Sequence, residues 1–304
     1  VIAVAFVTGV LLAFLAMAHG FEATVKGTGS ADVAVVLRKG GDELNSVLMR
    51  EQAQLMQEAP GVAKSRDGRP LVSPELYVVI DGIKRSSQTK ANLPLRGLGV
   101  LADQVRSGVR ITQGRMFRTG TNELVVGRAV SKQFDGFEIG RKIRLASQNW
   151  IVVGEFEAGG SVFESELWAD VAVLQSLYQR GSSVQTLRVR MESPASLPKL
   201  KSYSEADPRL KLDVKSEPEF YAAQSEGMST MIKVMGWPLA IAMSFGALAG
   251  ALNTMYASVD ARMREIATMR AIGFGGFPAF AGTMVESLLL SAVGGILGAA
   301  LCFL

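Results

Sequence analysis

Four charged side chains, set between two long apolar stretches, are the residues whose types and spacing best fit a function. Arg262, Arg264, Glu265 and Arg270 all lie within residues 260–273. Apolar residues recur there at steps of three and four, which places them on one face of a helix. Arg262 and Glu265 are three residues apart and can pair on its surface. The sequence therefore predicts a short amphipathic helix at a membrane surface, and a solvated turn is the alternative. Its apolar face would consist of Val259, Met263, Ile266, Met269 and Ile272.

Sequence motifs of the common catalytic centres are absent. The chain has no G-x-x-x-x-G-K-[ST] phosphate loop, no G-x-S-x-G nucleophile turn and no H-E-x-x-H zinc motif. Its single histidine, His19, and single cysteine, Cys302, exclude an internal disulfide and a Cys/His metal cluster. We therefore expect no catalytic residue, metal site or cofactor in this chain, and an enzymatic outer domain is the weakest hypothesis.

Apolar segments flank the charged helix on both sides. Residues 234–259 contain no charged side chain, and residues 274–304 contain one ionisable group, Glu286. Residues 1–19 are also apolar, and we predict that all three segments enter a membrane because about 20 such residues cross its core. The A-x-A pattern at residues 16–18 leaves a secretory signal as the alternative for the first. An ionisable side chain in a span usually faces protein or water, so Glu286 is expected to have a structural or coupling role near the cytoplasmic side.

The arginines of the charged helix also predict the orientation of the chain. Short loops rich in Lys and Arg stay in the cytoplasm, so residues 260–273 should be cytoplasmic and residues 20–217 extracytoplasmic. No strong stop signal follows Ser216, and we predict a stalk helix over residues 218–259 that continues into the second span. A break near Pro238 into two helices is the alternative.

Small residues form two rows in the predicted spans. Such rows let helices approach closely. Contact between two copies of the chain is one interpretation of the first row, and lipid-facing glycines are the alternative. The rows are Ala242, Gly246 and Gly250 in the second span, and Gly294 and Gly298 in the third.

Residues 20–217 have the mixed composition of an α+β domain. The whole chain is 48% apolar and 20% charged with a net charge of +4, and without a Lys/Arg tract nucleic-acid binding is not expected. Asp42 should cap a helix over residues 43–58, and a second helix is predicted over residues 128–134. The inward side chains of the first helix would be Leu44, Val47, Leu48 and Leu55. Strands are predicted at residues 32–38, 76–80, 95–100, 123–126, 142–145, 150–156, 167–174, 186–191 and 210–215, the first of them in a β-α-β unit.

The charged helix and the segment after it resemble the permease domain of the MacB/FtsX family of ABC transporters. The resemblance rests on R-E-I at residues 264–266, R-A-I-G at 270–273, Glu286 and G-G-I-L-G at 294–298. The family form has Gly where this chain has Ala267, and Ala is the better helix former. By this resemblance the segment is a coupling helix that docks onto an ATPase subunit through Arg262, Arg264, Glu265, Ile266, Arg270, Ile272 and Gly273. Phrases at residues 114–117, 123–127 and 152–154 follow the order of the family's periplasmic core domain.

The resemblance also implies the remaining organisation. The fold would be that of an α+β membrane protein, with transmembrane helices flanking a large two-lobed extracytoplasmic domain of MacB periplasmic-core type. The family has four spans, so the first is expected to be truncated and a fourth to be missing here. The domains would be residues 1–19, 20–217, 218–259, 260–273 and 274–304.

The same resemblance implies a function and a set of partners. The chain would be a permease in the bacterial inner membrane that transmits ATP-driven motion to its outer domain for export or extraction of a substrate. Expected partners are an ABC ATPase that binds ATP and Mg, a second permease copy, the lipid bilayer, and a periplasmic adaptor with an outer-membrane duct. Lipoprotein release and the non-transporting regulation of a cell-wall hydrolase are the alternatives.

Overall fold

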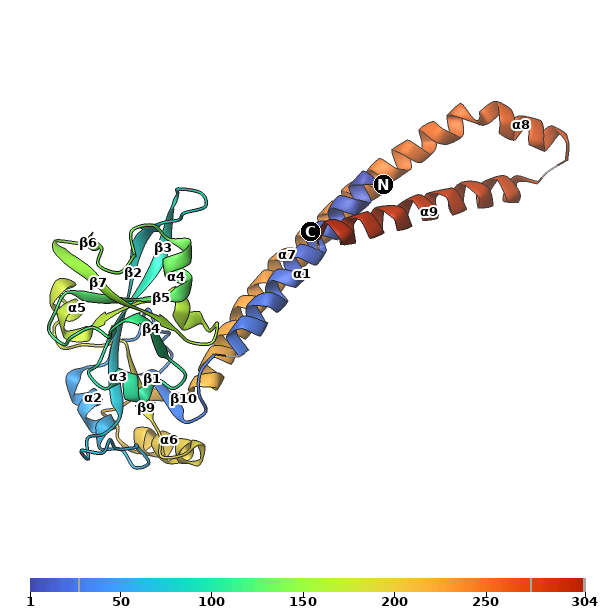
Figure 1. Cartoon of the computed structure of the whole chain (residues 1–304). Coiled ribbons are helices and arrows are strands. Elements are labelled where there is room, and N and C mark those ends of the chain that lie inside the picture. The colour runs from blue at the N-terminus through green and yellow to red at the C-terminus, as the bar shows by residue number, and fades with distance from the viewer. Residues whose placement is uncertain (27, 274, 303–304) are drawn as a thin grey trace. The chain divides into compact units, whose positions relative to one another are not determined.

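The computed structural model describes residues 1–26, 28–273 and 275–302 and divides the chain into two compact units (Figure 1). The helical unit comprises Val1–Ala23 and Ser225–Leu304, and the sheet unit comprises Thr24–Gln224. Residues 274 and 304, at the ends of the expected third span, lie outside the described part.

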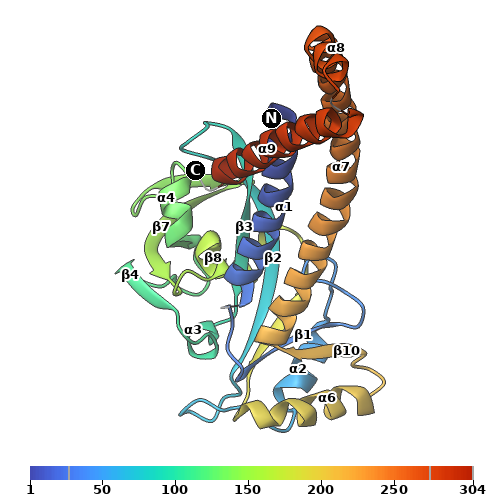
Figure 2. The same ribbon diagram turned by 90° about the vertical axis from the view of Figure 1, so that its right-hand side faces the viewer.

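Long apolar helices make up the helical unit, as their composition predicts. They are α1 (Ile2–Lys26), α7 (Glu217–Ala261) and α9 (Gly276–Cys302), with the short α8 (Met263–Ala271) between the last two (Figure 1). The first turns of α7, up to Gln224, belong to the sheet unit. Among the residues that the structure describes, three segments are long and apolar enough to cross a membrane, namely Ile2–Gly20, Glu217–Ala261 and Met284–Cys302. Both views show α9 crossing α1 (Figure 2).

Helix α7 is a single helix of 45 residues with Pro238 inside it. It begins directly after a strand, where the backbone N–H of Glu219 donates to the Ser216 hydroxyl at 3.3 Å. A hydroxyl that accepts from one of the free N–H groups of the first turn is the expected helix cap. The structure thus has one continuous helix in place of the alternative break near Pro238.

One mixed sheet organises the sheet unit. Its strand order is β10-β1-β9-β2-β3-β8-β5-β7-β4, with β6 paired to β7. Neighbouring strands are antiparallel except for the parallel pairs β3–β8 and β5–β7. The strands are β1 (Val33–Arg38), β2 (Val72–Ile83), β3 (Lys90–Leu98), β4 (Arg110–Gly114), β5 (Glu123–Gly127), β6 (Lys142–Leu145), β7 (Gln148–Glu157), β8 (Leu167–Asp170), β9 (Thr186–Arg190) and β10 (Leu212–Ser216).

Short helices cover the sheet, and two of them were expected from the sequence. They are α2 (Arg50–Gln57), α3 (Ala102–Val105), α4 (Arg128–Gln133), α5 (Val171–Leu177) and α6 (Leu197–Ala206), with 3₁₀ turns at Val162–Ser165 and Pro194–Ser196. The path β1-α2-β2 is a split β-α-β unit, because β9 lies antiparallel between β1 and β2. Strands β2 and β3 follow as an antiparallel hairpin.

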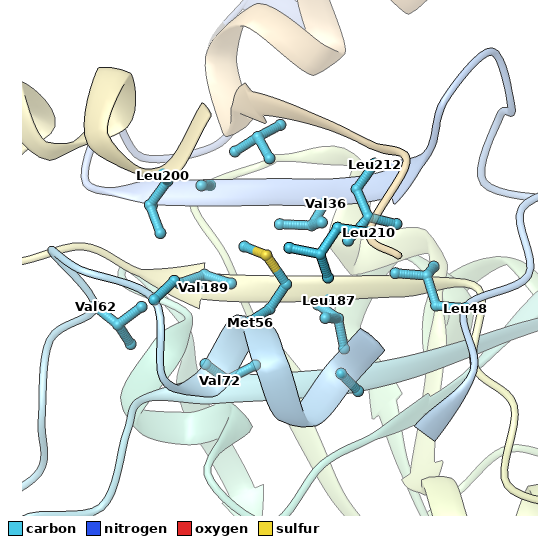
Figure 3. Close-up of a cluster of buried hydrophobic side chains, with 14 of the residues drawn as sticks. Val36, Leu48, Met56, Val62, Val72, Leu187, Val189, Leu200, Leu210 and Leu212 are labelled. Atoms are coloured by element: carbon cyan, nitrogen blue, oxygen red, sulfur yellow. The ribbon is translucent and has the colours of Figure 1, made fainter. Parts of the chain in front are cut away.

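The buried apolar side chains of the sheet unit form two main clusters. The first lies between β1, β9, β10 and helices α2 and α6, and Figure 3 shows Met56 at its centre among Val36, Leu187 and Val189. The second includes Leu76, Leu95 and Trp150 and lies under α4 and α5. Along β2, Val72 belongs to the first cluster and Leu76 to the second. Since alternate residues of a strand face opposite sides, Ser73 and Glu75 lie on the other face of the sheet.

The predicted helix over residues 43–58 is wrong in its first half. Helix α2 begins at Arg50, and Asp42 caps only a turn, in which its carboxylate accepts from the N–H groups of Leu44 and Asn45. The Leu48 backbone exchanges hydrogen bonds of 2.7 and 3.0 Å with Val184, and this bridge holds the segment extended. Leu44 and Val47 are consequently exposed rather than inward, while Leu48 is buried.

The strand predicted at residues 167–174 ends four residues early. Strand β8 stops at Asp170, whose carboxylate accepts from the N–H groups of Ala172 and Val173 and so caps α5. The β-branched run after Asp170 favours a strand by composition, but the cap starts a helix there. Strand β4 and helices α3 and α6 were not predicted.

Candidate functional site

The charged helix of the helical unit is α8, at the turn between α7 and α9 (Figure 1). It ends as expected, since Gly273 has φ +101° and its N–H donates to the Arg270 carbonyl at 3.1 Å. Its apolar face is largely uncovered, with Met263 60% and Ile272 73% exposed. Helix α8 therefore presents an apolar face without a covering element in the described part of the chain.

The charged side chains near α8 divide into paired and unpaired ones. Arg262 donates to both carboxylate oxygens of Glu286 in α9, at 3.0 and 3.4 Å. The surface pair between Arg262 and Glu265 that their spacing allows is not formed, because the fold brings the Glu286 carboxylate to the guanidinium instead. Among the described residues, Arg264, Glu265 and Arg270 have no ion-pair partner, so their charges are free for another molecule.

The two glycine rows have different surroundings within the helical unit. A Cβ on Gly294 would lie 2.7 Å from the Val1 carbonyl oxygen, and one on Gly298 would overlap the carbonyl oxygen of Ala5. Helix α9 thus approaches the α1 backbone closely through this row. Gly246 and Gly250 have open space around them in the described structure, and Ala242 is exposed.

A buried cluster of charged residues, which sequence reasoning missed, lies in the sheet unit. We call it the buried charge strip, because its strand members sit on the face of the sheet opposite the two apolar clusters. Cross-strand pairing aligns Arg188 with Ser73 and Arg96 with both Tyr77 and Trp168. The strip consists of Glu43, Glu75, Arg96, Arg106, Glu166, Arg188 and Glu217, all of them buried.

Glu75 is the centre of the buried charge strip. Its side chain is fully buried and accepts hydrogen bonds from three guanidiniums, those of Arg96 at 3.2 Å, Arg106 at 2.7 Å and Arg188 at 3.2 Å. Burial by itself would raise the pKa of Glu75, but the positive charges of Arg106, Arg188 and Arg96 outweigh it and lower the pKa from 4.5 to about 2. The carboxylate therefore stays ionised.

Arg96 connects two further carboxylates to Glu75. It binds Glu43, in the loop after β1, at 2.5 and 3.2 Å, and it binds Glu166, just before β8, at 2.8 and 2.6 Å. The Trp168 indole N–H donates to Glu166 at 3.0 Å. A carboxylate bound at two points has a fixed orientation relative to the guanidinium. Because Glu43 and Glu166 come from different parts of the sheet unit, the strip links elements of both apolar clusters.

The first turn of α7 also belongs to the strip. The Glu217 carboxylate pairs with Arg188 and accepts from the Ser30 N–H at 2.9 Å. The hydroxyl of Tyr221, one turn later, accepts from Arg188 at 2.8 Å. Arg188 therefore holds the start of α7 while it also binds Glu75.

One sequence signal could have revealed the strip. Glu75, Arg96 and Arg188 each occur inside an otherwise strand-like run, directly beside apolar residues that are candidates for burial. A charge there is costly unless it is paired. The partners, however, come from positions more than 20 residues apart, and no local pattern identifies them.

Comparison with known proteins identifies the family. The sequence profile described as the MacB-like periplasmic core domain matches residues 1–206. This match covers more than half of the chain. The chain belongs to the MacB-like family of ABC transporter permeases.

Solved structures of MacB-like domains are similar to part of this chain. The periplasmic region of MacB from Actinobacillus actinomycetemcomitans aligns with 66% of this chain and 92% of its own, at 14% identity and a TM-score of 0.45. The extracellular domain of the ABC-type transporter YknZ from Gram-positive bacteria aligns with 60% of this chain and 100% of its own, at 15% identity and a TM-score of 0.43. No curated protein matches the chain.

Membership in the MacB-like family places the chain among the transmembrane components of ABC transporters, which work with an ABC ATPase. MacB-like transporters sit in the inner membrane and carry an extracytoplasmic domain. The family match includes α1 and most of the buried charge strip, up to Arg188, and it ends before Glu217 and α8.

Proposed function

We propose that this MacB-like chain is the permease subunit that receives ATP-driven motion through α8 and passes it along α7 to the extracytoplasmic domain. The observation that carries the proposal is α8 itself. It is a short, separate helix between two long apolar ones, with an exposed apolar face and three charged side chains, Arg264, Glu265 and Arg270, that have no ion-pair partner in the described chain. Such a surface suits docking onto another protein.

The position of α8 in the chain supports a coupling role. Helix α7 ends at Ala261, a single residue separates it from α8, and α9 starts at Gly276. The Arg262–Glu286 ion pair ties the junction of α7 and α8 to α9. A displacement of α8 is therefore passed to two rigid helices, and rigid elements joined at packed contacts can carry motion over distance.

The expected organisation of the transporter follows from the same proposal. The sheet unit would be the extracytoplasmic domain and the three apolar helices would be spans of a multi-pass inner-membrane protein, with α8 in the cytoplasm. A two-lobed arrangement of the domain is supported by its two apolar clusters, since β3 to β8 lie between β2 and β9 in the sequence. The open row of Ala242, Gly246 and Gly250 suits contact with a second copy.

The nucleotide chemistry would belong to the partner. The chain has no phosphate-binding loop, so ATP and Mg would be bound by the ATPase subunit. We propose export or extraction of a substrate as the outcome, with a periplasmic adaptor and an outer-membrane duct as candidate partners. Lipoprotein release is the alternative within the family, and regulation of a cell-wall hydrolase is the alternative outside transport.

Substitution of Arg264 tests the proposal. The chain is co-purified with its native ATPase in nanodiscs, and ATPase rates are compared for wild type and Arg264→Glu. Reversal of a charge at a docked surface should weaken the complex about tenfold or more, which corresponds to about 1.4 kcal/mol. Arg144→Glu, at an exposed position of β6, makes the same charge change away from α8 and should have no effect.

Two outcomes would contradict the proposal. If no ATPase co-purifies with the wild-type chain, α8 is not its docking element. If Arg264→Glu and Arg144→Glu leave binding and ATPase rates equally unchanged, the charged face of α8 is not used. A wild-type complex that binds a hydrolase, without substrate-dependent ATPase stimulation, would favour the signalling alternative.

A further inference from the structure

The sheet unit holds the start of α7 in two different ways. The first is covalent, since β10 ends at Ser216 and α7 begins at Glu217. Strand β10 is an edge strand that pairs with β1, so this connection reaches the side of the sheet that carries the first apolar cluster. Motion of α7 would thus be delivered directly only to the β10 edge of the sheet.

The second connection runs through buried side chains and reaches the other side. Glu217 and Tyr221 of α7 both contact Arg188 of β9. Arg188 in turn binds Glu75 of β2, and Glu75 binds Arg96 of β3. From Arg96 the contacts continue to Glu166, just before β8, and from Glu166 to Trp168 of β8, next to the second apolar cluster.

The geometry of this chain of contacts makes it stiff. Arg188, Glu75 and Arg96 have side chains that are at most 1% exposed, so water cannot readily replace a lost partner. A planar guanidinium with several directed donors holds its partners in fixed orientation. Removal of one member leaves a buried charge unpaired, which is costly. The members of the strip are therefore expected to move together.

We propose that the buried charge strip is the joint that makes the second apolar cluster follow α7, with Arg188 as its positioning residue. This inference rests on the proposed function, because it concerns how motion of α7 is distributed. Without the strip, β3 and β8 with the second cluster would be connected to α7 only through the backbone hydrogen bonds of the sheet, so their response should be much weaker than that of the first cluster and its strands. Tyr221 adds a ring contact with Phe163, which a change of its hydroxyl leaves in place.

Hydrogen exchange tests the proposal in the intact complex with the native ATPase in nanodiscs, without nucleotide and with ATP bound. Two regions report on the two sides of the sheet, residues 186–216 around the first cluster and residues 90–98 with 167–177 at the second. In wild type, ATP should change exchange in both regions. In Glu217→Gln/Tyr221→Phe the change should persist in residues 186–216 and fall at least about threefold in the second region, while the ATPase rate stays as in wild type.

A matched control separates the joint from general weakening of the domain. Glu123→Gln/Tyr178→Phe makes the same two changes on the second-cluster side, where Glu123 pairs with Arg115 at 2.5 Å and does not belong to the strip. It should keep the wild-type response in both regions. Tyr221→Phe alone removes one hydroxyl and should give a smaller loss of the same kind. This single variant should keep its fold even if the double substitution unfolds the domain.

The outcomes distinguish this inference from the proposed function. If ATP changes exchange in neither region of the wild type, the proposed function fails and the joint fails with it. If the wild type responds and Glu217→Gln/Tyr221→Phe or Tyr221→Phe responds equally in both regions, the strip is not the joint. A loss in both regions at once would also overturn the proposal, since the β10 connection is intact in these variants.

Discussion

The two units of this chain use arginine and glutamate in opposite ways. In the sheet unit, Arg96 and Arg188 are buried and each contacts more than one carboxylate. In the helical unit, Arg264 and Arg270 are exposed on α8, and among the described residues they have no carboxylate partner. Paired and buried charges hold one conformation, whereas unpaired surface charges are available to another molecule. The same residue types thus stabilise the fold in the sheet unit and are available to bind another molecule in the helical unit.

The sharpest test of this comparison is loss of one arginine from each unit. Arg188→Met should lower the free energy of unfolding by about 3–5 kcal/mol, because Glu75 and Glu217 lose a buried partner. Arg264→Met should change it by less than about 0.5 kcal/mol, as exposed substitutions usually do. Urea unfolding followed by tryptophan fluorescence measures both, since Trp150 and Trp168 are buried in the sheet unit and Trp237 lies in α7 of the helical unit. Equal effects of the two variants would mean that the buried and the exposed arginine contribute equally to stability.

Acid should weaken the sheet unit through Glu75. Its pKa is 4.5 ordinarily and about 2 in the folded chain. A carboxyl with a lowered folded pKa stabilises the fold above its unfolded value and loses this contribution as the pH falls, here between 4.5 and 2. The contribution is on the order of 3 kcal/mol. Unfolding of wild type and Glu75→Gln is compared at several pH values.

The expected result is a stability difference that is large at pH 6 and narrows as the pH approaches 2. The matched variant Glu265→Gln, on the exposed α8, makes the same change outside the strip and should leave the stability of the sheet unit as in wild type. A constant difference between wild type and Glu75→Gln over this range would mean that the Glu75 charge does not stabilise the fold.

The two glycine rows allow a packed and an open position to be compared within the helical unit. Gly298→Ala should destabilise the unit by about 1–3 kcal/mol, because the new Cβ overlaps the Ala5 carbonyl of α1. Gly246→Ala has open space in the described structure and should be neutral or stabilise α7 by up to about 1 kcal/mol. Thermal unfolding in nanodiscs, followed by helical circular dichroism, measures both. A marked loss for Gly246→Ala would show that a second copy covers this row.

The smallest effect is expected at the Arg262–Glu286 pair. Both side chains are about half exposed, at 50% and 47%, and such pairs contribute roughly 0.2–1 kcal/mol. A double-mutant cycle of Arg262→Gln and Glu286→Gln should show this coupling in the free energy of unfolding. The same cycle with Glu265→Gln in place of Glu286→Gln should show none. Coupling to Glu265 instead would indicate the local pair and contradict the pairing of Arg262 with Glu286.

Local patterns predicted those parts of the fold that depend on neighbouring residues. The end of α8 at Gly273, the start of α7 after Ser216 and most strands of the sheet lie where composition and spacing placed them. The errors arose where a distant partner decided the backbone. Leu48 leaves the predicted helix because it pairs with Val184, far along the chain, and no short-range signal contains that information.

The apolar segments, the charged helix between two of them, and the family resemblance were determined by the sequence alone, because hydropathy and motif spacing are local properties. The order of the strands, the pairing of Arg262 with Glu286 and the buried charge strip were decided by the tertiary structure. Glu43, Glu75, Arg188 and Glu217 are widely separated in sequence and meet only when the sheet has formed. A charge can remain buried only if folding brings it a partner, so the strip exists only in the folded domain.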